Sequence, residues 1–262
     1  MLSRKYRFEE MLPSELNNII KEKSIAYLPV GSMERHGPHM AMGMDTAHAY
    51  AVALGLAEKL GGVVFPPLYI GTECMRSPET LKKIGFSGHE EIVGMDFPEN
   101  TLKSMYWPED LYREIMKQQI TFLCNMGFRT VVIVNGHGAD NQIRVLNELS
   151  EQLSEETGSR VIAQFILFED CGIGVGHAGL LETSVMLALK PEGVDLGQLP
   201  KKPQKLKNTD YAIVDSETFN FGGNQDFTVI HDPRDADAQI GRKVIEYEIN
   251  RCAEEIKNLI GG

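Results

Sequence analysis

Short apolar runs alternate along this chain with longer stretches whose apolar residues recur at helical spacing. The β-branched run 130–134 is the clearest predicted strand, and the apolar runs 25–30, 63–65 and 161–168 predict three more. Because strands and helices alternate, the pattern predicts an α/β fold with a mostly parallel sheet flanked by helices. The predicted helices cover residues 8–23, 47–60, 108–125, 139–156, 178–189 and 236–260.

Two long segments lack this regular pattern. Residues 69–108 mix glycine, proline, methionine and aromatic residues, and residues 191–235 are polar and contain prolines. A loop as long as the first segment inside a compact domain is usually functional or an assembly surface. Since no linker-like stretch divides the chain, residues 1–262 are predicted to form a single domain that is large enough to bury a substantial core.

Composition excludes several classes of partner. The 262 residues carry a formal net charge of −11, so the basic face that nucleic-acid binding needs is not expected. The N-terminus is charged, and no apolar run approaches the roughly 18 residues of a membrane span, so no membrane partner is expected either. The four cysteines are far apart without paired spacing, which fits a reducing cytoplasm. They are Cys74, Cys124, Cys171 and Cys252.

Candidate chemistry gathers at the ends of three predicted strands. Histidine and carboxylate residues stand beside glycines there, and the carboxyl ends of parallel strands meet at one edge of a sheet, where ligands bind. The candidates are Glu34, His36 and Asp45 after the first strand, His137 after the strand 130–134, and His177 and Glu182 after the strand 161–168.

The charges of these candidates suit two metal ions. Glu34, Asp45 and Glu182 contribute three negative charges, and a bridging hydroxide adds a fourth, which two divalent cations would balance. Imidazoles and carboxylates are the ligands that such cations prefer. The sequence therefore predicts a metal-dependent hydrolase that acts on a small-molecule substrate.

Ordinary structural roles compete with this interpretation. Asp45 could be a helix N-cap, and Glu182 a solvated carboxylate in the first turn of a helix. His39 could support the site from outside the ligand set. The remaining histidines, His48, His89 and His231, have no carboxylate and glycine context and are predicted to have only structural contacts.

Two further functional alternatives use parts of the same sequence. Residues 136–141 follow a strand, open a helix and imitate part of a dinucleotide-binding fingerprint, but the third glycine is missing. Cys171 precedes His177 and could be a nucleophile, although no orienting asparagine is evident.

Taken together, the motifs resemble those of the creatininase (creatinine amidohydrolase) family. The resemblance rests on residues 28–39, on Asp45, on residues 134–138 and on residues 177–189, in the order and spacing of that family. It implies a one-domain layered α/β sandwich, two divalent metal ions per chain (zinc or manganese or both) and hydrolysis of a non-peptide C–N bond. It also implies a homo-oligomer, with the hexamer the common form in the family.

The resemblance also implies ligand roles. In creatininase a glutamate follows the metal-binding histidine by two residues, but here that position is Ala139, so the second metal is expected to use Glu182 instead. The implied sets are Glu34, Asp45 and His137 for one metal, and His36, Asp45 and Glu182 for the other, with Asp45 bridging.

A second departure concerns the substrate. Creatininase closes its pocket with a tryptophan shortly before the His-x-Gly motif, whereas residues 170–176 contain none, which argues against creatinine. The expected reaction is hydrolysis of a small cyclic amide or amidine, with His177 passing a proton to the leaving nitrogen and Glu182 acting as ligand or acid–base group. The alternatives are a deformylase or keto-inositol hydrolase that uses the same site, and a metal-binding assembly protein without turnover.

Overall fold

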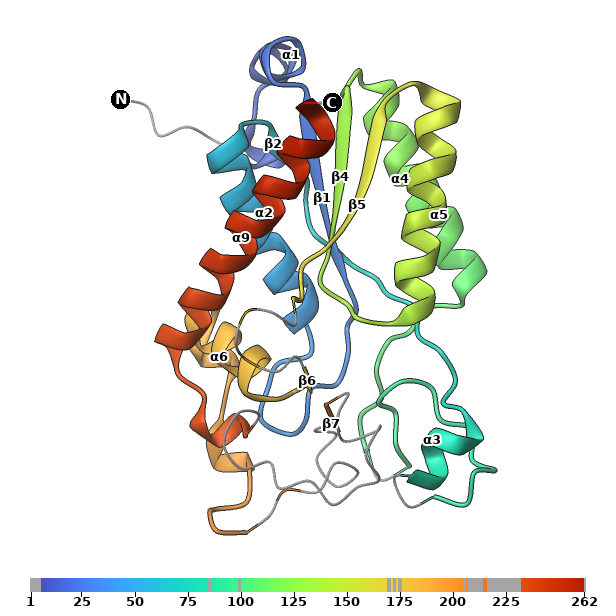
Figure 1. Cartoon of the computed structure of the whole chain (residues 1–262), viewed down its shortest axis with the longest axis vertical. Coiled ribbons are helices and arrows are strands. Elements are labelled where there is room, and N and C mark those ends of the chain that lie inside the picture. The colour runs from blue at the N-terminus through green and yellow to red at the C-terminus, as the bar shows by residue number, and fades with distance from the viewer. Residues whose placement is uncertain are drawn as a thin grey trace.

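A parallel sheet forms the centre of the molecule (Figure 1). The computed structural model describes residues 6–83, 86–98, 100–168, 171, 173, 176–204, 206, 214–215 and 232–261. Within these residues the strand order is β2-β1-β4-β5, and β3 pairs with β1 beyond the end of β2. The strands are β1 (Ile25–Gly31), β2 (Val63–Val64), β3 (Leu68–Tyr69), β4 (Thr130–Asn135) and β5 (Arg160–Phe165).

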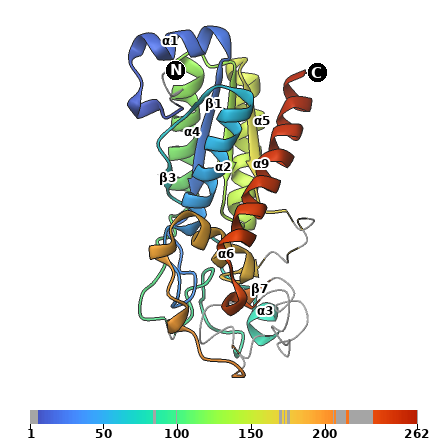
Figure 2. The ribbon, with the colours of Figure 1, turned by 90° about the vertical axis from the view of Figure 1, so that its left-hand side faces the viewer.

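Helices cover both faces of this sheet (Figures 1 and 2). They are α1 (Pro13–Glu22), α2 (Met44–Leu60), α3 (Pro78–Lys83), α4 (Glu109–Asn125), α5 (Asp140–Thr157), α6 (Leu180–Leu189) and α9 (Ala238–Gly261). The short 3-10 helices are η1 (Phe8–Glu10), η3 (Pro191–Gly193), η4 (Leu196–Gln198) and η5 (Pro233–Asp235). A small antiparallel pair, β6 (Gly176–His177) and β7 (Val214–Asp215), lies near the lower end in Figure 1.

The alternation of side chains along β1 explains the three layers. Every residue of this strand is buried, as expected for a central parallel strand. Leu28 packs into the cluster formed with α4 and α5, whereas the neighbouring Tyr27 packs into the cluster formed with α2 and α9. The predicted α/β class, with a mostly parallel sheet flanked by helices, is confirmed.

Several predicted boundaries shift for identifiable reasons. The first helix begins at Pro13 rather than residue 8, because proline is favoured in the first turn, where a backbone donor is not needed. The helix predicted over 47–60 begins earlier, at Met44, after Gly43. The strand predicted over 161–168 ends at Phe165, and β3 and α3 lie within the segment predicted to be irregular.

Helix α6 is held at the carboxyl edge of the sheet by α2 and α9. Its buried Leu181 and Val185 share a cluster with Met44 of α2 and Val244 of α9. Helix α9 approaches so closely that a Cβ atom at Gly241 would overlap the carbonyl oxygen of Ser184. This packing fixes the first turn of α6, which carries Glu182.

Gly241→Ala is therefore expected to lower the free energy of unfolding by about 1–3 kcal/mol, the typical cost of overpacking, despite alanine's better helix propensity. The midpoint of urea unfolding measures this change. The matched control is Gln239→Ala, an exposed position in the same turn, which should change the free energy by less than about 0.5 kcal/mol. Equal midpoints for both variants would contradict the tight α6–α9 contact.

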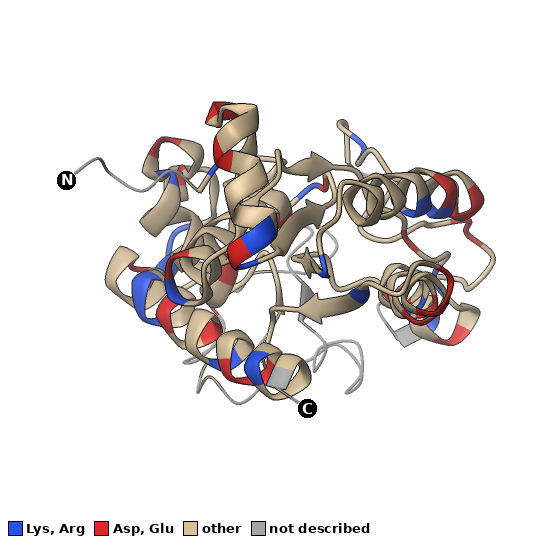
Figure 3. Ribbon diagram, turned by 90° about the horizontal axis from the view of Figure 1, so that it is seen from above, with Lys and Arg blue, Asp and Glu red and all other residues tan. Residues whose placement is uncertain are grey.

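Charges of both signs are interspersed over the helices in the view of Figure 3. This mixture accords with a net charge of −11 on a chain that has 26 basic and 37 acidic residues. Within the described part of the chain, none of the helices combines the length and apolar character needed to cross a bilayer.

Candidate metal centre

All the predicted site residues except His36 line one pocket at the carboxyl edge of the sheet. The pocket has a volume of about 670 Å³ and lies where parallel α/β sheets bind ligands. His36 is fully buried beneath it, within 4 Å of three of the carboxylates. The predicted residues in the lining are Glu34, Asp45, His137, His177 and Glu182.

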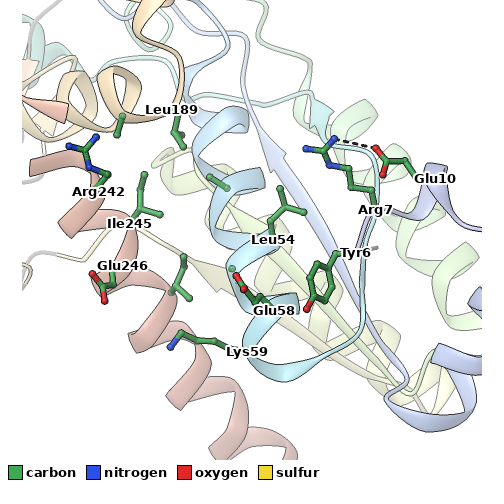
Figure 4. A pocket seen from close by; sticks show the side chains of 14 residues that line it. Tyr6, Arg7, Glu10, Leu54, Glu58, Lys59, Leu189, Arg242, Ile245 and Glu246 are labelled. Atoms are coloured by element: carbon green, nitrogen blue, oxygen red, sulfur yellow. Dashed lines mark hydrogen bonds and ion pairs between the residues drawn. The ribbon is translucent and has the colours of Figure 1, made fainter. Parts of the chain in front are cut away.

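A larger hollow, of about 950 Å³, lies on the outside of the molecule and is drawn in Figure 4. It is formed by α2, α6, α9 and the segment around Tyr6, and its rim carries the Arg7–Glu10 ion pair. Its described lining contains no histidine, no cysteine and none of the predicted site residues. The smaller pocket is thus the one in which the candidate chemistry lies.

Asp45 stands at the centre of the cluster. Its Oδ1 lies 3.0 Å from Nε2 of His36, and its Oδ2 lies 3.0 Å from Nδ1 of His137. The two oxygens therefore face two different imidazoles, which is the arrangement of a carboxylate that bridges two ions. Ligand atoms within 4.8 Å of one another define three groups that could hold a metal. These are Glu34, Asp45 and His137; His36, Asp45 and Glu182; and Glu34, His36 and His177.

The position of Asp45 depends on two glycines and one serine. A Cβ atom at Gly31 would lie 2.7 Å from Cβ of Asp45, and one at Gly136 would overlap the Asp45 carbonyl oxygen. The ends of β1 and β4 thereby leave room for the first turn of α2. The interpretation of Asp45 as an N-cap is wrong, since Gly43 occupies that position and the buried Asp45 carboxylate accepts a hydrogen bond from Ser32 Oγ at 2.7 Å.

Ser32→Ala is expected to weaken metal binding about 10–100-fold, as is typical when a hydrogen bond to a ligating carboxylate is removed. Competition with a chromogenic chelator measures the affinity. Ser24→Ala is the matched control, because Ser24 is equally buried at the opposite end of β1 and bonds only backbone groups. An affinity loss of the same size in both variants would mean that the effect of Ser32 is general rather than local.

His36 is oriented by its own loop. Its Nδ1 lies 3.1 Å from the carbonyl oxygen of Glu34, which fixes that nitrogen as the protonated one and turns Nε2 toward the carboxylates. Nε2 is buried and makes no hydrogen bond of good geometry, although Oδ1 of Asp45 lies 3.0 Å away. The ring also stacks on that of His177, with centroids 4.3 Å apart. A buried nitrogen that faces carboxylates is the environment of a metal ligand.

Glu182 is buried rather than solvated, which corrects its alternative interpretation as a surface residue. One of its oxygens, Oε2, lies 3.6 Å from Nε2 of His36 and accepts the backbone N–H of Ala178 at 2.5 Å. Ala178 has a φ of 55°, a left-handed conformation that is uncommon outside glycine and clusters at functional sites. This turn aims the Ala178 N–H at Glu182 and sets His177 beside the pocket.

His177 lies in the small sheet β6–β7 rather than directly after the main-sheet strand β5. Its Nε2 donates to the Arg35 carbonyl oxygen at 2.8 Å, so Nδ1 faces the pocket, 3.7 Å from Oε2 of Glu34. Burial lowers the pKa of His177 to about 4, against the opposing effect of Glu34. The ring therefore presents an unprotonated Nδ1 to the pocket.

His137 is fixed through its backbone. The side chain of Asn135 accepts the His137 N–H at 3.1 Å and donates to the His137 carbonyl oxygen at 2.9 Å. Gln142, on the first turn of α5, donates to the same Asn135 oxygen at 2.8 Å. These bonds hold Nδ1 of His137 against Asp45 and 3.2 Å from Oε2 of Glu34.

The electrostatics of the cluster call for positive charge. Burial lowers the pKa of His36, but the carboxylates around it, Asp45 first, raise that pKa to about 10. Burial raises the pKa of Glu182 to about 7, and the pKa of Glu34, which burial also raises, is lowered to about 2 by His177 and His137. Divalent cations would supply this charge in place of protons, and the nitrogen and oxygen donors fit zinc or manganese.

Three residues of the site are absent from the sequence prediction. Ser32 is one, and the other two come from the segment predicted to be irregular. The hydroxyl of Tyr106 donates to Oε1 of Glu34, and the carboxylate of Glu73 lies 3.9 Å from Nε2 of His137. Neither Tyr106 nor Glu73 stands in a distinctive local motif. The sequence indicated a functional role for this segment through the length of residues 69–108 alone.

The other candidates have structural surroundings. His39 is buried and bonds Thr183 Oγ1 at 3.0 Å, one residue from Glu182. His48 pairs with Glu248 of α9 at 2.5 Å in the core, and His89 is exposed, whereas His231 lies outside the described residues.

The two alternative active sites find no support in these contacts. Cys171 donates to the carbonyl oxygen of Ile173 and is not among the described residues that line the pocket. Residues 136–141 resemble part of a dinucleotide-binding fingerprint. There the backbone of Asp45 fills the space beside Gly136 that a pyrophosphate would need.

Comparison with known proteins identifies relatives across most of the chain. Residues 9–256 match the sequence profile of the creatininase family, described as creatinine amidohydrolase. A creatinine amidohydrolase from Pseudomonas putida is 28% identical over 197 residues, or 68% of this chain and 69% of that protein. A mycofactocin precursor peptide peptidase from Mycolicibacterium smegmatis is 25% identical over 249 residues, or 88% and 83%. A 3-dehydro-scyllo-inosose hydrolase from Thermotoga maritima is 25% identical over 133 residues, or 51% and 36%.

Solved structures share the fold. A crystal structure of creatinine amidohydrolase matches with a TM-score of 0.67 at 22% identity and covers 98% of both chains. A creatininase structure described as a manganese form has a TM-score of 0.67 at 21% identity, with 97% of this chain and 98% of that one covered. A mutant described as a zinc–zinc type has a TM-score of 0.67 at 22% identity, with 98% of each chain covered.

Proposed function

This chain belongs to the creatininase family, and we propose that it is a binuclear-metal hydrolase that cleaves a non-peptide C–N bond of a small cyclic amide or amidine. The family membership supports a hydrolase, and the relatives of known activity hydrolyse different substrates. The proposal therefore depends on the residues of the pocket itself.

The observation that carries the proposal is the shared carboxylate of Asp45. One of its oxygens faces His36, which forms a possible metal-binding group with Asp45 and Glu182. The other oxygen faces His137, which forms a second such group with Asp45 and Glu34. Two three-residue groups that share one carboxylate match the ligand sets implied by the family resemblance, with Glu182 standing in for the glutamate that Ala139 replaces. When bound there, two divalent ions would supply an activated water and Lewis acidity toward the scissile carbonyl.

The chain's own residues have separate tasks in this reaction. His177, whose tautomer is fixed by the Arg35 carbonyl oxygen, takes a proton at Nδ1 and delivers it to the leaving nitrogen. Tyr106 holds the second oxygen of Glu34, so that its Oε2 stays directed at His137. In the stretch 136–138, the N–H groups of Gly136 and His137 are already bonded, to the Val30 carbonyl oxygen and to the Asn135 side chain, so the Gly138 N–H is the one that would stabilise negative charge on the reacting oxygen.

A second candidate is hydrolysis of a formyl group or of a C–C bond in a keto-sugar by the same residues. The relative named 3-dehydro-scyllo-inosose hydrolase favours the keto-sugar alternative alone, since 51% of the chain matches part of that enzyme. A metal-binding assembly protein without turnover is the rival from another class. The two hydrolase hypotheses and the assembly-protein hypothesis all include the metal site. They differ in the reaction that is catalysed, or in having none.

Metal analysis followed by a substrate panel tests the proposal. Protein purified without added metal should contain about two zinc or manganese ions per chain, as two-metal hydrolases do. The panel should hold lactams, cyclic amidines including creatinine, formamides and a keto-inositol. We expect turnover of at least one cyclic amide or amidine, lost with a chelator and restored by zinc or manganese. Absence of bound metal would refute the proposal, and metal without turnover on the whole panel would favour the assembly protein.

A further inference from the structure

His137 has a ring nitrogen that the proposed reaction does not use. Its Nδ1 faces Asp45, Glu34 and Ser32, whereas Nε2 is buried without a hydrogen-bond partner. If Nδ1 binds a cation, the proton of the neutral ring must be on Nε2. A buried N–H of this kind is costly unless an acceptor is available.

The carboxylate of Glu73 lies closest to this nitrogen among the ion pairs of the described residues. Its Oε2 lies 3.9 Å from Nε2 of His137, and its side chain is only 12% exposed. The other oxygen accepts the backbone N–H of Cys74 at 2.6 Å, which fixes the orientation of the carboxylate. A Cβ atom at Gly94 would overlap Cγ of Glu73, so the backbone at Gly94 packs directly against this side chain.

Buried side chains join the backbone around Glu73 to the loop of His137. The Thr72 N–H donates to Oε1 of Gln142 at 3.0 Å, and Nε2 of the same Gln142 donates to Asn135 at 2.8 Å. Asn135 in turn clamps the backbone of His137. The backbone next to Glu73 is thus tied to the loop of His137 by a continuous hydrogen-bonded path.

We propose that Glu73 is a positioning residue that accepts the Nε2 proton of His137 and thereby fixes Nδ1 as the nitrogen that holds metal; this rests on the proposed function. Closing the 3.9 Å gap to hydrogen-bonding distance needs a shift of the Glu73 side chain of about 1 Å. A carboxylate on the far nitrogen of a ligating imidazole orients the ring and makes it a stronger ligand.

The geometry separates this role from direct ligation. Glu73 is in none of the three groups that could hold a metal within the described residues. It lies on the Nε2 side of the His137 ring, and the two ring nitrogens point in different directions. The contact of Glu73 with the candidate ligands therefore runs through His137.

The test compares Glu73→Ala and Glu73→Gln in the full chain, with zinc affinity measured by chelator competition. Removing an outer partner typically weakens metal binding about 10–100-fold, so this loss is expected for Glu73→Ala at one of the two sites. Glu73→Gln should recover part of the affinity, because an amide oxygen still accepts the Nε2 proton. A general effect of pocket charge would instead weaken both variants equally.

Asp140→Ala is the matched control, because Asp140 is an exposed carboxylate in the lining of the same pocket and forms no ion pair with His137. Its zinc affinity should stay within about twofold of wild type, since it orients no ligand. Nitrogen-15 spectra of the zinc-loaded protein give a second readout, in which His137 should carry its proton on Nε2 in wild type. Unchanged zinc affinity in Glu73→Ala, or a proton on Nδ1, would overturn the inference.

The outcomes distinguish this inference from the proposed function. A wild-type chain that binds no zinc would refute the metal site itself. A wild-type chain that binds zinc as tightly as Glu73→Ala would refute only the positioning role.

Discussion

Asp45→Ala is expected to remove both metal ions and all measurable hydrolysis. Asp45 belongs to two of the three groups that could hold a metal, with one oxygen facing the histidine of each, so its loss leaves two ligands in either of them. Elemental analysis should fall from about two ions per chain to nearly none, because neither pair retains the charge to hold a divalent cation.

Thermal unfolding gives an independent measure of the same loss. A cation that binds only the folded chain raises its melting temperature, so zinc should raise that of the wild type, whereas Asp45→Ala should show no rise. Asp195→Ala is the control, since this exposed carboxylate only caps the short helix η4 and should keep the full response to zinc. Two ions retained by Asp45→Ala would contradict the bridging role.

Much of the fold follows from periodicity alone. The run 130–134 is apolar and β-branched without alternation, which is typical of a strand buried on both faces. In the sheet, β4 indeed lies between β1 and β5 and is fully buried. The strand–helix alternation then fixes a parallel sheet with helices on both faces. Short elements such as β3 and α3 could not be predicted, because two to six residues carry too little pattern.

The candidate site was predictable because its candidate ligands follow strands. Glu34, His36 and His137 come within a few residues of the ends of β1 and β4, which are hydrogen-bonded neighbours in the sheet. Adjacent parallel strands must deliver such residues to the same edge. Topology, rather than any single motif, brings them together.

The residues that contact the candidate ligands from outside the ligand set could not be predicted from their position after a strand. Ser32 is an ordinary serine. Glu73 and Tyr106 lie in a segment whose path depends on a hydrogen bond to α5 and on the pairing of β3 with β1. Their roles arise from distances of a few ångströms to side chains far along the chain. A sequence without related sequences beside it does not encode those distances in a readable form.

For two carboxylates, the usual preferences of helix first turns suggest exposure to solvent, whereas the structure buries both. Asp45 and Glu182 both stand in the first turn of a helix, where exposed caps and dipole-stabilised carboxylates are common. Both are buried because the helix starts, α2 and α6, point into the pocket rather than toward solvent. Two buried carboxylates at converging helix starts are a stronger sign of a cation site than either residue alone.

His177→Gln is expected to reduce turnover about 10²–10⁴-fold, the usual contribution of a general acid–base group, while both ions remain bound. The glutamine amide can still donate to the Arg35 carbonyl oxygen, so the packing around the site is kept. It cannot carry a proton from the water to the leaving nitrogen. The side chain of His177 is 10% exposed, against 0% for His36 beneath it, as suits a group that meets the substrate.

Measuring kcat and ions per chain on the same preparation decides between the two roles open to His177. Because Glu34, His36 and His177 also form a group that could hold a cation, loss of one ion in His177→Gln would make this histidine a ligand instead of a proton carrier. Full activity would exclude both roles. His89→Gln is the control, since that exposed histidine lies outside the pocket lining and should change neither quantity.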